Sequence, residues 1–304
     1  MSFQFNRLRE NLEIFLLTTM DVMTDFELVT VAISGLNNVQ IVSGGMDASA
    51  VTLSGSLDGE RVFVKVVPKV SPGVRFASSV GHPQVLAPQS ITAMPDGRWA
   101  LVYPWIEGKN GFESVLQSHH WMEVGRILRE VHRSRSEYLL PETFVIEGLT
   151  EFASSRLTSP YQGLFEIHSA DLDRGFELVE RLSHECRDAS WEFVPCHADL
   201  HVGNIVVADD RVFLVDWDTA RLAPVECDFL FFESPGILLQ HTVIEEIGFR
   251  DGYGEMEPRK PLMSYYRFAR AFEDIVSFAR EGNVKWLERQ FGPGSMLDLA
   301  LSRA

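Results

Sequence analysis

The polar residues between Cys196 and Asp218 are the strongest candidates for chemistry in this 304-residue chain. The stretch reads CHADLHVGNIVVADDRVFLVDWD, so that an Asp, an Asn five positions later and another Asp are separated by short apolar runs. These runs predict a hairpin that returns Asp216 beside Asp199 and Asn204. Phosphoryl transfer from a nucleotide uses such a set, because one Asp orients the attacking hydroxyl while an Asn and a second Asp hold Mg²⁺. We therefore assign Asp199 as the catalytic base, and Asn204 and Asp216 as metal ligands.

His197 precedes the predicted base by two positions and completes the H-x-D-x-x-x-x-N spacing of kinase catalytic loops. We count it with the catalytic residues, in the role of bracing the loop. Two other interpretations stay open. The polar residues are also those that ordinary turns use, and His197, Asp199 and His201 alternate along an extended segment as transition-metal ligands of a hydrolase would. The metal interpretation leaves Asn204 without a role.

Composition narrows the classes of partner. The net charge of −16 argues against a nucleic-acid partner, which needs a basic face. The three cysteines, Cys186, Cys196 and Cys227, have neither disulfide-framework nor zinc spacing, which indicates a reducing compartment. The apolar run near the start is too short and interrupted for a membrane span, and it lacks a cleavage pattern. We expect a cytoplasmic monomer or weak dimer with no membrane partner.

Strand patterns dominate the first hundred residues, after a helical pattern in LRENLEIFLLTTM. Residues 38–67 predict three strands, with Asp58-Gly59 as a hairpin turn, and a second hairpin surrounds the turn at residues 95–97. Helical periodicity then takes over, in WMEVGRILREVHRSR and in a long last helix that stops at Gly282.

These patterns predict the α+β class in a bilobal arrangement. We expect a small N-terminal lobe at residues 1–102, built on a five-stranded antiparallel sheet, and a hinge at 103–108. Residues 109–304 form a larger, mainly helical lobe with the catalytic loop and the acceptor site.

The first lobe contains residues suited to a nucleotide. Lys65 interrupts an apolar strand, where a charge is costly unless it is paired, so we assign it to phosphates. An edge-strand lysine pointing to solvent is the alternative. In SGGMDAS, the backbone at Gly44, Gly45 and Ser49 is open to phosphate oxygens, although a plain hairpin turn has the same composition.

The hinge and the last helix supply the remaining candidates. The backbone and rings at Tyr103, Trp105 and Ile106 suit a purine base, although such aromatic residues also fill cores. For the acceptor, whose hydroxyl must face Asp199, we assign four further residues: Asp218, Tyr266, Glu273 and Asp274. Aromatic rings and carboxylates there suit a ring-shaped, cationic molecule, but helical spacing also makes these residues core candidates.

From about residue 40 to 280 the chain resembles the aminoglycoside phosphotransferase family, which has the protein-kinase-like fold. CHADLHVGNIVV is similar to the family's H-x-D-x-H-x-x-N loop, and LVDWDTARLAPVECDFLFF to its I-D-W-D…P…D-L segment. Stretches such as GGMDAS, YPWIEGKNGF and SYYRFARAFEDI look most like those of spectinomycin phosphotransferases. The resemblance implies that Lys65 contacts the α- and β-phosphates, and that Asp228 is a buried Asp hydrogen-bonded to the catalytic loop.

The resemblance implies an O-phosphotransferase that uses ATP or GTP with Mg²⁺ and modifies a hydroxylated small-molecule antibiotic. A metabolic kinase for choline, a sugar or homoserine would share this machinery. One departure keeps a nucleotide-binding pseudokinase open as well. Residues 66–95 contain no acidic residue to pair with Lys65, and PKVSPGVRFASSVGHP, broken by Gly and Pro, predicts a poor helix.

Overall fold

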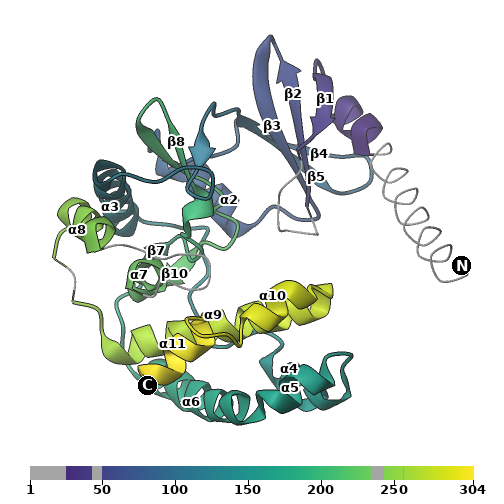
Figure 1. Cartoon of the computed structure of the whole chain (residues 1–304). Coiled ribbons are helices and arrows are strands. Elements are labelled where there is room, and N and C mark those ends of the chain that lie inside the picture. Colours follow the sequence, from purple (N-terminus) through teal and green to yellow (C-terminus); the bar gives the residue numbers. More distant parts are fainter. Residues whose placement is uncertain (1–24, 43–49, 234–242, 256) are drawn as a thin grey trace, which may run out of the picture. The chain divides into compact units, whose positions relative to one another are not determined.

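The computed structural model describes residues 25–42, 50–233, 243–255 and 257–304 (Figure 1). The helix expected in LRENLEIFLLTTM and the loop containing Gly44, Gly45 and Ser49 lie outside these residues. The chain forms two compact units. The first comprises residues up to Ser71 together with Leu86–Glu107, and the second comprises Pro72–Val85 and Gly108–Ala304.

The first unit is built on a five-stranded antiparallel sheet, as the sequence predicts. In spatial order its strands are β1 (Asn37–Ile41), β2 (Val51–Leu57), β3 (Glu60–Val67), β5 (Trp99–Pro104) and β4 (Ser90–Ala93). Asp58 and Gly59 join β2 to β3 with φ values of 52° and 87°, the left-handed pair that a tight hairpin requires. Alternate β3 residues, Val62, Val64 and Val66, pack in one core with the helical segment at residues 25–32.

The second unit is mainly helical, which confirms the predicted α+β class. Its helices are α2 (Pro72–Val80), α3 (Ser118–Arg133), α4 (Leu149–Ser155), α5 (Gln162–Ile167), α6 (Ser169–Asp188), α7 (Glu226–Glu233), α8 (Val243–Tyr253), α9 (Lys260–Glu281), α10 (Val284–Arg289) and α11 (Met296–Ser302). Short 3₁₀ turns cover η1 (Arg156–Thr158) and η2 (Val202–Asn204). Two small sheets complete the unit: β6 (Lys109–Asn110), β8 (Ile205–Ala208) and β9 (Arg211–Leu214) form one, and β7 (Val194–Cys196) and β10 (Arg221–Ala223) form the other.

Helix α9 is the central scaffold of this unit and contacts α6, α7, α10 and α11 (Figure 1). Twelve of its 22 residues are buried. It ends at Gly282, whose φ of 72° is the left-handed value favoured at a helix C-terminus. This confirms the predicted stop.

The expectation of a poor helix in PKVSPGVRFASSVGHP is wrong, because residues 72–80 form α2. Pro72 occupies the first helical position, where its missing N–H costs nothing, and Gly81, with a φ of 68°, follows the last turn. Packing supplies the rest: Phe76 is fully buried and its ring meets Trp217 edge-on at 6.1 Å between centroids. Tertiary contacts therefore override the weak local propensity.

Across the described parts of the chain, every helix is too short or too polar to cross a membrane.

Candidate active site

A buried carboxylate holds the predicted catalytic loop. Asp228, in the first turn of α7, is fully buried. Its Oδ2 accepts the backbone N–H of His197 at 2.9 Å, and its Oδ1 accepts that of Ala198 at 2.7 Å. His132 of α3 donates a third bond from Nε2 to Oδ2 at 3.0 Å. Burial alone would raise the pKa of Asp228, but these hydrogen bonds and the nearby histidines keep that pKa below its ordinary value.

His197 braces the loop from inside. Its Nε2 lies 2.9 Å from the carbonyl oxygen of Val215, and its Nδ1 accepts the backbone N–H of Asp199 at 3.3 Å. Because a carbonyl oxygen only accepts, Nε2 carries the ring proton. Both ring nitrogens are thus bonded to backbone, which fits a positioning role.

The hairpin β8–β9 brings the predicted metal ligands together. Ile205 pairs with Leu214, and the N–H of Val215 donates to the carbonyl of Asn204 at 3.0 Å, so Asp216 lies one residue from that contact. Asn204 is buried and donates from Nδ2 to the backbone carbonyl of Asp199 at 2.8 Å. Because Nδ2 is engaged in this bond, Oδ1 is the atom of the predicted ligand Asn204 that has lone pairs suited to a metal ion.

Two residues of the site have unusual backbone conformations. Ala198 and Asp216 have φ values of 67° and 62°, in the left-handed region that non-glycine residues rarely adopt. Such strain costs of the order of 1–3 kcal/mol per residue and persists where surrounding contacts enforce it. For Ala198, the enforcing contact is the bond from its N–H to Asp228.

The carboxylate of Asp199 is held on one side by an arginine. Its Oδ1 accepts a hydrogen bond from Nη1 of Arg270 at 2.7 Å, and Nε of the same guanidinium lies 3.0 Å from Oδ1 of Asp274. On the other side, Nε2 of His201 lies 3.8 Å from Oδ2 of Asp199. Nδ1 of His201 accepts the N–H of Gly203 at 3.0 Å, so its ring proton is on the nitrogen that faces Asp199.

The charges around Asp199 are coupled. Burial alone would lower the pKa of Arg270, but the carboxylates of Asp274 and Asp199 outweigh it and raise that pKa. Burial also lowers the pKa of His201, partly offset by Asp199. At neutral pH, Asp199 therefore lies between a cationic guanidinium and a neutral imidazole.

A pocket adjoins the loop at Ala198 and contains two of the predicted acceptor residues, Tyr266 and Glu273. The pocket is lined by Glu142, Val145, Ala198, Arg221, Cys227, Leu230, Phe231, Tyr265, Tyr266, Ala269, Arg270 and Glu273. Tyr266 is buried, and its hydroxyl has no hydrogen-bond partner among the described residues. Glu273 is an exposed residue, but the protein atoms packed around its carboxyl remove part of the water there and raise its pKa.

The other two predicted acceptor residues do not line this pocket. Asp274 binds Arg270 instead, and desolvation raises the pKa of its carboxyl against the lowering effect of that guanidinium. Asp218 is half-buried in the segment after β9. The structure thus places Tyr266 and Glu273 together and leaves Asp218 and Asp274 outside their pocket.

The first unit places the predicted nucleotide residues as follows. Lys65 is 8% exposed in β3, between Thr52 of β2 and Leu101 of β5 in register, so it is not the edge-strand lysine of the alternative. Tyr103, Trp105 and Ile106 are all half-buried.

Trp105 has a specific partner within this unit. The guanidinium of Arg61 lies 3.6 Å from the centre of its ring and also pairs with Glu107 at 2.9 Å. A cation stacked at this distance interacts favourably with an indole ring and holds it in place.

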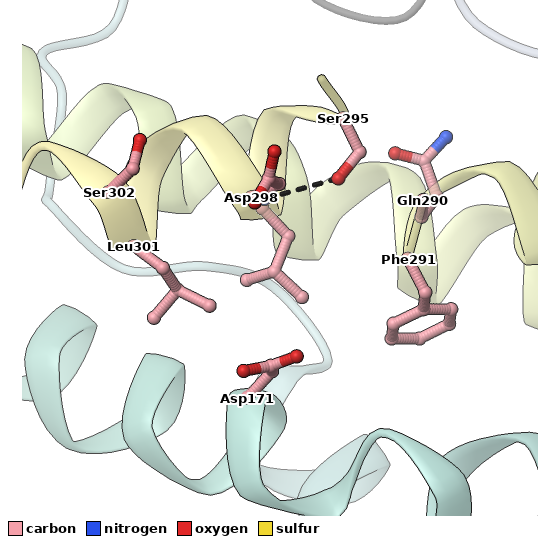
Figure 2. A pocket seen from close by; sticks show the side chains of 8 residues that line it. Asp171, Gln290, Phe291, Ser295, Asp298, Leu301 and Ser302 are labelled. Atoms are coloured by element: carbon pink, nitrogen blue, oxygen red, sulfur yellow. Dashed lines mark hydrogen bonds between the residues drawn. The ribbon is translucent and has the colours of Figure 1, made fainter. Parts of the chain in front are cut away.

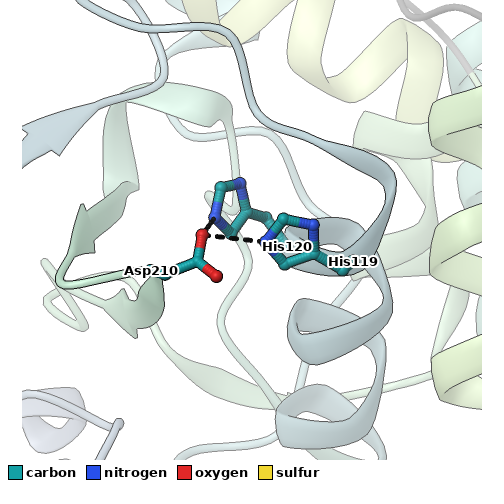
Figure 3. A group of neighbouring side chains, drawn as sticks. All are labelled: His119, His120 and Asp210. Atoms are coloured by element: carbon teal, nitrogen blue, oxygen red, sulfur yellow. Dashed lines mark hydrogen bonds and ion pairs between the residues drawn. The ribbon is translucent and has the colours of Figure 1, made fainter.

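Two clusters of described residues have metal-ligating side chains outside the predicted magnesium set. In one, Asp210 accepts from His119 at 2.9 Å and from His120 at 3.0 Å (Figure 3). Nδ1 of His120 accepts the backbone N–H of Gln117, so Nε2 carries the proton and is not a free ligand atom. This cluster therefore joins α3 to the turn between β8 and β9 by hydrogen bonds.

In the second cluster, His132, Cys196 and Asp228 are all buried. Asp228 already binds the catalytic loop, and burial raises the pKa of Cys196 well above its ordinary value, which disfavours the thiolate that a metal needs. The transition-metal interpretation of His197, Asp199 and His201 is not favoured either, because both nitrogens of His197 bind backbone.

A second pocket lies at the start of α6 and along α11 (Figure 2). Asp171 faces it from α6, while Phe291 and Leu301 project toward it from the opposite side. None of the predicted site residues lines this pocket.

Comparison with known proteins identifies the family. Residues 74–269 match the model of the phosphotransferase enzyme family, abbreviated APH, and the chain belongs to that family. The match begins in α2 and ends in α9, so it includes the catalytic loop, the hairpin and Asp228. No curated protein matches the chain.

Solved structures share the fold. A spectinomycin phosphotransferase in complex with ADP and spectinomycin is 22% identical, with a TM-score of 0.75 over 92% of this chain and 98% of that one. An aminoglycoside phosphotransferase, APH(4)-Ia, is 12% identical with a TM-score of 0.64, over 93% and 99% of the two chains. Choline kinase from Streptococcus pneumoniae is 15% identical with a TM-score of 0.62, over 94% and 98%. At these identities the likeness shows the fold, which confirms the protein-kinase-like architecture.

Three residues at the site were not predicted from the sequence. Arg270 pairs with Asp199, His132 donates to Asp228, and Arg221 forms an ion pair with Glu142 at 2.9 Å on the pocket wall. Helical periodicity gave the only available signal: His132 and Arg270 lie on helices, and spacing predicts the face a residue occupies but not its partner.

Proposed function

We propose that this protein is an O-phosphotransferase that moves the γ-phosphoryl group of ATP or GTP to a hydroxyl of a small-molecule antibiotic, either a spectinomycin-like aminoglycoside or another natural product. The single observation that carries the proposal is Asp199 itself. It lies on a loop braced by His197 and Asp228, beside the hairpin with Asn204 and Asp216 and next to a pocket. Family membership and the fold support phosphoryl transfer.

Asp199 acts on the acceptor through one oxygen. Because Oδ1 is bonded to Arg270, Oδ2 is the oxygen that receives the hydrogen bond of the incoming hydroxyl. Enzymatic phosphoryl transfer depends mainly on in-line positioning and charge stabilisation. A firmly oriented carboxylate is thus more useful here than a strongly basic one.

The residues at the hairpin fit Mg²⁺. An amide oxygen from Asn204 and a carboxylate from Asp216 are hard oxygen ligands, the type that Mg²⁺ prefers. When bound, the ion neutralises charge on the nucleotide phosphates. In the first unit, Lys65 is the proposed phosphate contact, and the segment from Tyr103 to Ile106 is the proposed base contact, with the loop at Gly44, Gly45 and Ser49 assigned from sequence alone.

The lining of the pocket is suited to polar groups of an acceptor. Tyr266 offers an unsatisfied hydroxyl and Glu273 a carboxylate, so a molecule with both hydroxyl and amine groups is complementary to it. The free space of this pocket is about 20 Å³, room for one small group, so we propose that one polar group of the acceptor enters it while the reacting hydroxyl faces Asp199.

A nucleoside-diphosphate release assay tests the proposal. Mg-ATP and Mg-GTP are supplied with spectinomycin, other aminoglycosides, nucleoside antibiotics, choline and homoserine, and the phosphorylated product is identified by mass spectrometry. Release stimulated by one antibiotic supports the proposal. Stimulation by choline or homoserine alone would make the protein a metabolic kinase, a function that the choline kinase fold also supports. Nucleotide binding without transfer to any acceptor would indicate a pseudokinase.

A further inference from the structure

Arg270 is the feature of the site that the proposed function does not explain. It comes from the middle of α9, 71 residues along the chain from Asp199, and its side chain is 22% exposed. The guanidinium bonds to Asp199 at 2.7 Å and to Asp274 at 3.0 Å, and it lies 5.6 Å from the centre of the Phe231 ring. A planar guanidinium with two carboxylates and an aromatic ring has little rotational freedom.

We infer that Arg270 is a positioning residue, which holds the Asp199 carboxylate so that Oδ2 faces the acceptor hydroxyl. This inference rests on the proposed function of Asp199. Without the bond from Arg270, His201 is, among the described residues, the one ion-pair partner on the Oδ2 side of Asp199, and its Nε2 is 3.8 Å away, so the carboxylate gains freedom to rotate. Because a misplacement of about 1 Å at a reacting group can lower a rate about 100-fold, the loss of this restraint affects turnover.

Asp274 orients the arginine in turn. It lies one helical turn after Arg270 on the same face of α9, and its carboxylate binds Nε, which leaves Nη1 directed at Asp199. The order Asp274, Arg270, Asp199 is therefore a fixed chain of charge-assisted hydrogen bonds. Asp274 therefore affects the proposed reaction indirectly, by orienting Arg270, and does not need to line the acceptor pocket.

A double-mutant cycle tests this inference. Arg270→Ala is made in the native protein and in Asp199→Asn, and kcat and acceptor KM are measured for transfer, with acceptor-independent hydrolysis of the nucleotide measured in parallel. We expect Arg270→Ala to lower kcat about 10- to 100-fold in the native background, with nucleotide KM changed less than about threefold. In the Asp199→Asn background the same change should lower kcat less than about twofold, because the group it positions is already altered.

Two further variants separate positioning from a structural role. Arg270→Lys keeps the charge and part of the reach, so it should recover part of the lost kcat. Arg280→Ala removes another α9 arginine, which pairs at the surface with Glu151, and should leave kcat unchanged. Equal losses from Arg270→Ala in both backgrounds, or no loss in either, would overturn the inference.

The proposed function and this inference fail in different ways. If no acceptor is phosphorylated, the proposed function fails, while the cycle still reports on Arg270 through nucleotide hydrolysis. If hydrolysis is also absent, crystal structures of the native protein and Arg270→Ala decide. If the Asp199 carboxylate keeps its orientation in Arg270→Ala, the inference is contradicted. If the carboxylate is rotated in the variant, the inference is supported.

Discussion

At the scale of single residues, the site is a set of restraints on one carboxylate. The backbone of Asp199 is fixed through His197 and its side chain through Arg270. Asn204 adds a third contact, to the backbone carbonyl of Asp199. Two of these restraints come from the loop and η2 next to Asp199, and the third comes from α9, so the position of the proposed base depends on both local and long-range packing.

Replacing Asp199 by Asn tests whether this carboxylate takes part in transfer. An amide of nearly the same shape keeps the fold, but its donor group opposes the guanidinium of Arg270 and it accepts no proton. We expect kcat to fall at least about 100-fold, which is the usual contribution of a general base. Nucleotide affinity, measured by calorimetry, should change little. An unchanged transfer rate would remove Asp199 from the mechanism.

Replacing Asp228 should affect the stability of the fold. Asp228→Asn turns a buried acceptor of three hydrogen bonds into a group that is partly a donor, so we expect a loss of about 3 kcal/mol in the free energy of unfolding. Asp173→Asn removes an exposed carboxylate that pairs with Arg156, and should cost less than about 1 kcal/mol. Denaturant titrations of the three proteins measure both differences.

The pH dependence of the Asp228 effect has a definite sign. The pKa of Asp228 is lowered in the folded protein, so its contribution is fully present above the ordinary aspartate pKa of about 4 and is lost as pH falls through the folded-state pKa. The stability gap between native protein and Asp228→Asn should therefore be constant near neutral pH and shrink in acid. A gap that stays constant down to about pH 3 would contradict the assignment.

At the scale of elements, α2 supports the segment that contains a proposed metal ligand. Gly73 packs so closely on this segment that an added Cβ would lie 1.8 Å from the carbonyl oxygen of Trp217, the residue after Asp216. Gly73→Ala must displace one backbone or the other, so we expect a loss of about 1–3 kcal/mol in stability. We also expect transfer to need a higher Mg²⁺ concentration for half its maximal rate, because Asp216 moves with its neighbour.

Gly163→Ala in α5 is the matched control. A Cβ at Gly163 meets nothing within 4 Å, and alanine favours helix by about 1 kcal/mol over glycine. Thermal unfolding should therefore shift up slightly for this variant and down for Gly73→Ala, with Mg²⁺ titrations changed only for the latter. Equal behaviour of the two variants would show that α2 does not position Asp216.

Local signals explain why much of the fold was predictable from the sequence. The Asp58-Gly59 turn, the β8–β9 hairpin and the stop at Gly282 each depend on a few neighbouring residues, and all three are confirmed. Helix α2 was not predictable, because the burial of Phe76 against Trp217 joins segments more than a hundred residues apart. The bond between Arg270 and Asp199 was not predictable for the same reason, because the two residues are 71 positions apart in the sequence.

At the scale of the whole molecule, the proposed catalytic residues and most of the family match lie in the second unit. The match covers residues 74–269, and the catalytic loop, the hairpin and the pocket all belong to that unit. The first unit contains the buried Lys65 and the aromatic segment at the end of β5, which we assign to the nucleotide as a proposal. The sequence could predict a sheet-based part followed by a helical part because strand and helix patterns separate along the chain.

Because the net charge of the chain is −16, we expect the salt dependence of kcat/KM to differ between cationic and neutral acceptors. An acidic protein attracts a cationic acceptor and repels an anionic nucleotide over distances that salt screens, with a Debye length of about 10 Å at 0.1 M. For a dicationic antibiotic, kcat/KM should fall several-fold between about 0.02 and 0.3 M salt, while for a neutral acceptor it should stay nearly constant.

The nucleotide gives the opposite expectation and serves as the internal control. Its KM should fall or stay level as salt rises, because screening weakens its repulsion by the acidic surface. Sodium chloride titrations at fixed Mg²⁺, with one cationic and one neutral acceptor, separate the two effects. If the cationic acceptor shows no dependence on salt, the acidity of the chain does not guide its substrate, and selection rests on contacts within the pocket, where Glu273 is the first residue to replace.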